Sequence, residues 1–101
     1  GENIDPTEIE RVAETCTGVR RAAAVAVTAE LDGTEIKLYL EPAAGQTVLV
    51  EEVLIRCTER LAAFKHPRYV EVIERLPLTA TQKVDRAALR ERSAVAVTDS
   101  R

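Results

Sequence analysis

Apolar residues near the start of the chain recur at the spacing of a helix. Four of them lie three or four residues apart: Ile9, Val12, Ala13 and Cys16. Asp5 is a preferred N-cap residue, Pro6 suits the first helical position, and Glu8 stands where a capping box has its acidic member. Gly18 follows at a position that favours the left-handed end of a helix. The pattern predicts an amphipathic helix that covers a sheet.

Two strands are expected next. Residues 22–28 form a nearly unbroken run of small and β-branched side chains, which is typical of a central strand buried on both faces. After a turn at residues 32–33, Ile36, Leu38 and Leu40 alternate with Lys37 and Tyr39. This alternation predicts a strand with one buried face. Because a short glycine-containing turn joins them, the two strands should pair as an antiparallel hairpin.

A second amphipathic helix is predicted to begin after Thr47, which can cap it. Its apolar stripe consists of five residues: Val50, Leu54, Cys57, Leu61 and Phe64. The helix should stop near Lys65, because His66 precedes Pro67 and a residue before proline is disfavoured in helical geometry. Residues 69–74 are expected to form a third strand.

The end of the chain completes the predicted fold. Residues 76–83 have neither helical nor alternating periodicity and are expected to form an exposed loop. Asp85 can cap a last short helix, and residues 93–101 are expected to be a disordered tail. The predicted fold class is α+β: a three-stranded, mostly antiparallel sheet packed against two main helices, with a short C-terminal helix. Residues 1–92 would form this domain.

Size and composition narrow the possible functions. A chain of 101 residues with 46% hydrophobic content can bury one core, but ligand pockets for several substrates usually need a second domain. A formal charge of −3, one Phe and two Tyr give no platform for nucleic acid. No segment approaches the roughly 20 apolar residues of a membrane span, so a cytoplasmic protein is expected. Cys16 and Cys57 are expected to be buried thiols rather than metal ligands.

Two groups of residues resemble a known family. The first is Phe64, Lys65, His66, Pro67 and Arg68, followed by Leu76, Pro77, Thr79, Thr81, Lys83, Val84, Arg86 and Leu89. The second is the opening Gly1, Glu2, Asn3, Ile4, Asp5 and Pro6, with Glu8, Ile9 and Glu10. Together they resemble the C-terminal domain of adenylate-forming enzymes, which include acyl-CoA synthetases, luciferases and peptide-synthetase adenylation domains. The opening is more similar to the acyl-CoA ligases, and the resemblance extends to about residue 92.

The resemblance implies a mobile domain of an AMP-forming acyl-CoA synthetase that uses ATP, Mg and coenzyme A. Its partner would be a large N-terminal adenylation domain of the same chain, and its substrate a carboxylic acid. Lys83 matches the family lysine that acts when the carboxylate attacks the α-phosphate of ATP. A compact ammonium suits this step because it stabilises negative charge shared by two anions. The alternative is an ordinary solvated surface lysine.

The same resemblance implies a second orientation of the domain, in which thioester formation takes place. Gly1, Glu2 and Asn3 would then line the channel for the pantetheine arm of coenzyme A, since a glycine permits close approach of the backbone. His66, Pro67 and Arg68 would contact the nucleotide end of coenzyme A, with Arg68 as the phosphate ligand. The alternative for Gly1 is that it does not belong to the natural chain. The alternative for the cations near Arg68 is that they only stabilise the helix end by interacting with the helix dipole.

Two departures from the family pattern stand out. Gln82 occupies the place where the family usually has glycine, and a glutamine at positive φ would cost on the order of 1 kcal/mol. The turn at residues 32–35 is also shortened and lacks an arginine that could contact coenzyme A. Two rival functions are a small-molecule-binding regulatory domain, which shares this order of elements, and a KH-like RNA-binding module, which needs a Gly-x-x-Gly loop that this sequence lacks.

Overall fold

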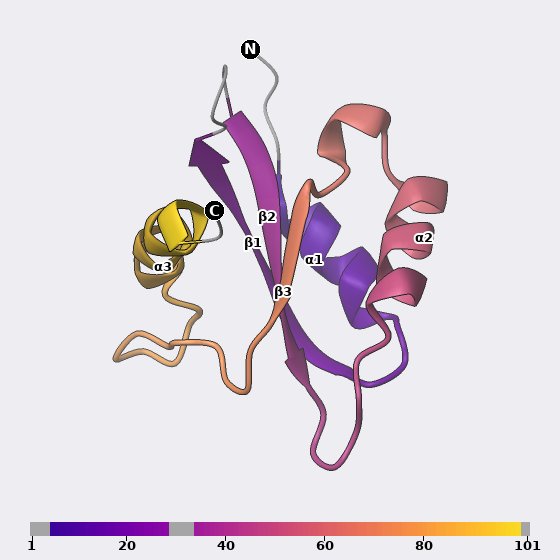
Figure 1. Ribbon diagram of the computed structural model, residues 1–101. Helices are drawn as coiled ribbons and strands as arrows, with labels where there is room; N and C mark the ends of the chain where they lie inside the picture. Colours follow the sequence, from indigo (N-terminus) through magenta and orange to yellow (C-terminus); the bar gives the residue numbers. More distant parts are fainter. Residues whose placement is uncertain (1–4, 29–33, 100–101) are drawn as a thin grey trace.

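The computed structural model describes residues 5–28 and 34–99. Within them the chain forms α1 (Pro6–Glu14), β1 (Val19–Thr28), β2 (Thr34–Pro42), α2 (Val50–Arg60), the 3-10 turn η1 (Ala63–Lys65), β3 (Tyr69–Val72) and α3 (Arg86–Asp99). The sheet order is β1-β2-β3, with β1 antiparallel to β2 and β2 parallel to β3. The predicted α+β class and the mostly antiparallel sheet are confirmed, with β3 as the parallel member (Figure 1).

Helices cover both faces of the sheet, so the fold has three layers. Figure 1 shows α1 and α2 on one side and α3 on the other. The first face packs alternate strand residues such as Ala24 and Leu38 against α1 and α2, around Ile9 and Val53. The second face packs the intervening residues against Leu89 of α3. Residues of opposite parity along each strand therefore enter two separate cores.

The cap of α1 follows the sequence prediction closely. The Asp5 carboxylate accepts a hydrogen bond from the Thr7 backbone N–H at 3.0 Å, and Pro6 is the first helical residue. Gly18 has the expected positive φ of +83°, but it does not close the helix: α1 ends at Glu14 with Thr15 as its C-cap, and Gly18 lies in the turn before β1. Glu8 does not complete a capping box, because its carboxylate pairs with the Lys65 ammonium instead.

The run of small residues expected to be the central strand is β1, which lies at the edge of the sheet. It is buried because helices cover both of its faces, and two α1 carboxylates protect its outer edge. Glu10 accepts a hydrogen bond from the Ala24 N–H at 2.9 Å, and Glu14 accepts one from the Ala22 N–H at 2.9 Å. The prediction of two buried faces was right, but the position in the sheet was wrong.

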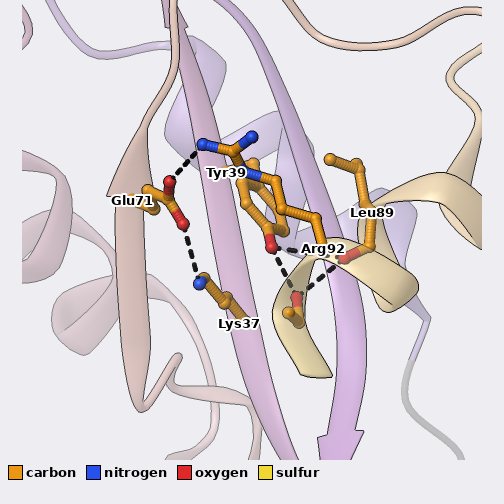
Figure 2. A network of polar contacts seen from close by, with 6 residues as sticks. Lys37, Tyr39, Glu71, Leu89 and Arg92 are labelled. Carbon is orange, nitrogen blue, oxygen red and sulfur yellow. Dashed lines mark hydrogen bonds and ion pairs between the residues drawn. The ribbon is translucent and has the colours of Figure 1, made fainter. Parts of the chain in front are cut away.

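The prediction of a single buried face for the next strand was also wrong. β2 is central, and Lys37 and Tyr39 on its second face are only 6% and 0% exposed. Figure 2 shows how they are satisfied: Glu71 accepts from the Lys37 ammonium at 2.8 Å and from Arg92 at 2.6 Å. The Tyr39 hydroxyl donates to the Leu89 carbonyl at 3.2 Å, and the hydroxyl of Ser93 lies beside it.

This polar network determines the charge of Glu71. Burial alone would raise the pKa of the Glu71 carboxyl, but hydrogen bonds from Lys37 and Arg92 outweigh burial and hold the pKa below its ordinary value. The carboxylate therefore stays ionised beside the buried ammonium, which would otherwise lack a counter-charge. The network also ties α3 to β2, because Arg92 belongs to α3.

The second helix is shorter than expected at both ends. It begins at Val50 rather than after Thr47, and ends at Arg60, before the separate turn η1. Thr47 packs on Gly18, where an added Cβ would lie 2.5 Å from the Thr47 carbonyl oxygen. The buried residues of α2 are Val53 and Cys57, with Leu61 just after it, whereas Leu54 and Phe64 of the expected stripe are 37% and 46% exposed.

The last two elements also differ in length from their predictions. β3 ends at Val72, two residues before the expected end of the strand. α3 continues to Asp99, through residues that were expected to be a tail. Ser93 is only 1% exposed, and its hydroxyl donates to the Leu89 carbonyl at 2.8 Å, so the helix packs on the sheet at this point. The division into a domain of residues 1–92 and a tail stays a prediction.

The two cysteines are free and buried in the core between α1 and α2, as predicted. Burial, with a smaller contribution from the Cys16 thiol, raises the pKa of Cys57 from 9.0 to about 11. A raised pKa means that the folded chain keeps a proton that the unfolded chain loses between these two pH values. Stability from this thiol is therefore complete below pH 9 and is lost as the pH rises through 11.

We expect the free energy of unfolding to fall by about 2 kcal/mol between pH 9 and pH 11 through Cys57 alone. Urea unfolding of the chain at intervals across this range measures the loss. Cys57→Ala removes the titrating group and should show a shallower decline, although its stability at pH 7 is lower. Equal slopes for the two proteins would contradict the assignment to Cys57.

Candidate active-site loop

The segment between β3 and α3 folds into a hairpin that carries Lys83 near its tip. Leu78 and Val84 pair as an antiparallel bridge. The Thr79 N–H donates to the Lys83 carbonyl at 2.7 Å, and the Asp85 N–H donates to the Pro77 carbonyl at 2.8 Å. The sequence predicted an exposed loop here, and these bonds between its two arms give that loop a fixed shape.

Thr79 makes most of the contacts that close the tip. Its carbonyl accepts from the Gln82 N–H at 2.9 Å. Its hydroxyl oxygen accepts from the Lys83 N–H at 3.3 Å and lies 3.1 Å from the hydroxyl of Thr81. One threonine therefore fixes the backbone of the residues on either side of the turn, including the residue that carries the ammonium.

The turn has an unusual backbone at Gln82, whose φ is +68°. Within residues 5–28 and 34–99 it is the one non-glycine residue with a positive φ. Left-handed backbone is unfavourable for a residue with a Cβ, by about 1–2 kcal/mol in a regular left-handed helix. Position 82 therefore has the backbone geometry that favours glycine, and the glutamine found there is strained, as the comparison with the family pattern suggested.

The base of the hairpin is anchored by the start of α3. Asp85 caps the helix by accepting from the Ala88 N–H at 3.1 Å, as the sequence predicted. Arg86 reaches around the edge of β1 and donates to both carboxylate oxygens of Glu10, at 2.8 Å and 2.6 Å. Lys83 thus stands three residues from an ion pair that ties α3 to α1.

The Lys83 side chain itself is exposed. Among residues 5–28 and 34–99 its ammonium forms no ion pair and no hydrogen bond, whereas Lys37 and Lys65 each pair with a glutamate. A fixed backbone with a free ammonium is what a residue needs if it is to bind an anion supplied by another body. The arrangement is compatible with both expectations for Lys83, a catalytic group or a solvated surface lysine.

The other cationic candidates lie at the opposite end of β3. Arg68 precedes this strand and its N–H donates to the Ile36 carbonyl at 2.9 Å, whereas the hairpin follows it (Figure 1). The Arg68 side chain is 62% exposed and lies 3.9 Å from the Glu35 carboxylate, a distance at which an exposed pair contributes little. Its guanidinium carbon lies over the Tyr69 ring, 5.8 Å from the ring centre.

Arg68's neighbours are more constrained. His66 is half-buried, with its Nε2 2.9 Å from the Leu61 carbonyl, and Pro67 is half-buried beside it. Lys65 is engaged by Glu8 of α1. Of the cationic side chains expected to bind phosphate here, Arg68 is therefore the remaining candidate. Gly1, Glu2 and Asn3, and the turn at residues 32–33, lie outside the described residues.

Sequence reasoning gave no role to two residues that shape the loop. In the sequence, Thr79 and Glu10 stand out only as members of the family pattern. A threonine that begins a short turn often bonds its own backbone a few residues on, and this was the available signal for Thr79. The contact of Glu10 with Arg86 joins residues far apart in the sequence, and local patterning gives no signal for it.

The chain matches the family model described as the AMP-binding enzyme C-terminal domain over residues 8–83. The chain belongs to this family. Among similar proteins are the mitochondrial medium-chain acyl-CoA ligase ACSF2 of Danio rerio and the oxalate–CoA ligase of Arabidopsis thaliana, each 38% identical. The alignments cover 92% and 85% of this chain but only 15% and 17% of those enzymes. The chain therefore spans less than a fifth of the length of these curated relatives.

Solved structures show the same fold. A Mycobacterium tuberculosis fatty acyl CoA synthetase matches 95% of the chain at a TM-score of 0.84 and 29% identity, over 19% of its own length. ATP-bound MatB from Rhodopseudomonas palustris matches 91% at a TM-score of 0.83 and 29% identity, over 18% of its length. The helices in the described residues include none long and apolar enough to cross a bilayer. Because ACSF2 is named as mitochondrial, the cytoplasmic location of this family member stays a prediction.

Thr79→Val should loosen the hairpin without unfolding this family member. The change removes the hydroxyl that accepts from the Lys83 N–H but keeps the side chain's shape, and one such hydrogen bond contributes about 1 kcal/mol. We expect the Lys83 amide to exchange with deuterium about fivefold faster. Thr79→Ser is the matched control and should keep the wild-type rate. A valine variant that exchanges no faster than the serine variant would exclude this role for the hydroxyl.

Proposed function

We propose that the chain is the mobile C-terminal domain of an ATP-dependent, AMP-forming acyl-CoA synthetase, a carboxylic-acid–CoA ligase. The observation that carries the proposal is the exposed Lys83 ammonium, which has no partner among residues 5–28 and 34–99 and stands on a fixed hairpin, in a member of the AMP-binding enzyme C-terminal family. The names of its relatives, medium-chain acyl-CoA ligase and oxalate–CoA ligase, support the ligase class. The alternative of a regulatory domain rested on the order of elements alone, and the family assignment favours the ligase.

In the first half-reaction Lys83 would act on the developing negative charge. A carboxylate oxygen of the acid attacks the α-phosphorus of ATP, the bond to the bridging oxygen breaks, and pyrophosphate leaves with that electron pair. The ammonium can stabilise the charge on the α-phosphate and the leaving group at once, because it presents three donors from one point charge. The large N-terminal domain of the same chain would bind the nucleotide and the carboxylic acid.

The described residues bring no metal-binding group to this step. They contain no cluster of three histidine, cysteine, aspartate or glutamate side chains. In the proposal Mg²⁺ accompanies the ATP and is held within the large domain. Lys83 would add positive charge from the side of the mobile domain.

In the second half-reaction the opposite end of β3 would face the large domain. Arg68 precedes β3 and the Lys83 hairpin follows it, so the two cations extend from opposite ends of this strand (Figure 1). We propose that rotation of the domain removes Lys83 and brings Arg68, with His66 and Pro67, to the nucleotide end of coenzyme A. Gly1, Glu2 and Asn3 would line the passage of the pantetheine arm.

Lys83→Ala in the full-length ligase should reduce ATP–pyrophosphate exchange by about 10²–10³-fold, as the loss of one stabilising donor does in other charge-developing reactions. Thioester formation from supplied acyl-adenylate should stay within about twofold of the wild type, because the ammonium is withdrawn in that step. Arg11→Ala removes an exposed cation of α1 and should change neither rate. Equal losses in the two half-reactions would contradict the division of labour.

Arg68→Ala should raise the KM for coenzyme A by about tenfold while leaving pyrophosphate exchange unchanged, because a charge-assisted hydrogen bond to phosphate contributes about 1.5–3 kcal/mol. Glu35→Gln is the matched control, because it removes the carboxylate beside Arg68 but keeps the guanidinium. If Arg68 acted only by holding Glu35, the two variants would behave alike. Steady-state kinetics with coenzyme A as the varied substrate distinguishes these outcomes.

A further inference from the structure

Gln82 and Lys83 belong to the same turn of the hairpin and move with it. The two residues are adjacent and both are exposed. Their backbone N–H groups both bond to Thr79, so the turn moves as one body. If the Lys83 ammonium enters a nucleotide pocket, the backbone of the preceding residue is carried toward that pocket as well, with its exposed side chain.

The backbone of Gln82 has a conformation that favours glycine. Gly18 and Gly45, the glycines with positive φ in the described residues, have φ values of +83° and +71°, close to the +68° of Gln82. The Gln82 carboxamide makes no hydrogen bond to residues 5–28 or 34–99 that would offset the strain, and the residue bonds to Thr79 through its backbone N–H. A strained residue whose side chain makes no compensating contact within its own domain is a candidate for a contact with another domain or a ligand.

The chemistry of the proposed pocket determines which end of the amide would be used. A carboxylate and a triphosphate present only electron-rich oxygens to an incoming group. A carboxamide has two N–H donors and one oxygen acceptor, so it would turn its NH₂ group toward them. Unlike the ammonium it brings no charge, and it contributes direction rather than long-range attraction.

We propose that Gln82 is a second catalytic residue of the hairpin, whose side-chain NH₂ group donates a hydrogen bond to a phosphate oxygen of the nucleotide during adenylation. The inference rests on the proposed function, because it needs Lys83 to reach the same nucleotide. It assigns a role to the residue that departs from the family's usual glycine. It also explains why a residue with a strained backbone stands beside the ammonium.

The test uses the full-length ligase and compares Gln82→Gly with Gln82→Glu. Glycine removes the donor and relieves the strain, so pyrophosphate exchange should fall about tenfold while the thermal midpoint of the protein does not fall. Glutamate keeps the shape but replaces the donor with a negative charge beside phosphate, so its exchange rate should fall further. Thioester formation from supplied acyl-adenylate should be unaffected in both variants.

Lys83→Ala is measured in parallel to separate two kinds of failure. If Lys83→Ala loses exchange but Gln82→Gly matches or exceeds the wild type, the Gln82 proposal is overturned and the function of Lys83 stands. If Lys83→Ala keeps its exchange activity, the proposed function fails first. A fall in the thermal midpoint of Gln82→Gly together with its activity would also overturn the proposal, because it would assign the residue a structural role.

Discussion

The carboxylate of Glu10 joins the three layers of the domain. It accepts a hydrogen bond from the Ala24 N–H on the edge of β1 at 2.9 Å, and it receives the guanidinium of Arg86 from α3. α1 lies on one face of the sheet and α3 on the other, so this pair passes around the edge strand. Removing one member of such a half-buried pair would leave an unpaired charge against the sheet. The position of the Lys83 hairpin depends on it, because the hairpin leads directly into α3.

A second constraint is that the sheet is covered on both faces. Small residues of β1 allow two helical layers to approach, and β2 between its neighbours must then accommodate Lys37 and Tyr39 in the interior. The structure does so by pairing the ammonium with Glu71 and the phenol with the backbone of α3. A polar network of this kind is favourable only when all members are satisfied, and it makes the docking of α3 specific rather than merely hydrophobic.

Local chemistry made much of the fold predictable from the sequence. Asp5 and Asp85 cap helices through bonds to residues two or three positions away, so the starts of α1 and α3 could be inferred. The glycine-like geometry at position 82 could be anticipated from the family pattern. The burial of Lys37 could not, because its partner Glu71 lies on another strand. The late start of α2 could not be predicted either, since Thr47 packs on Gly18, which is distant from it in the sequence.

The carboxylates of α1 that bond to the outer N–H groups of β1 have a practical consequence for handling the domain. An uncovered strand edge is a template on which a second chain can add, and this leads to aggregation. α1 is therefore a protective cover as well as a packing element. The family match begins at residue 8, inside α1, and a fragment cut at that point would lack the Asp5 cap and the first turn. Such a fragment would expose its edge more often and would be difficult to keep in solution.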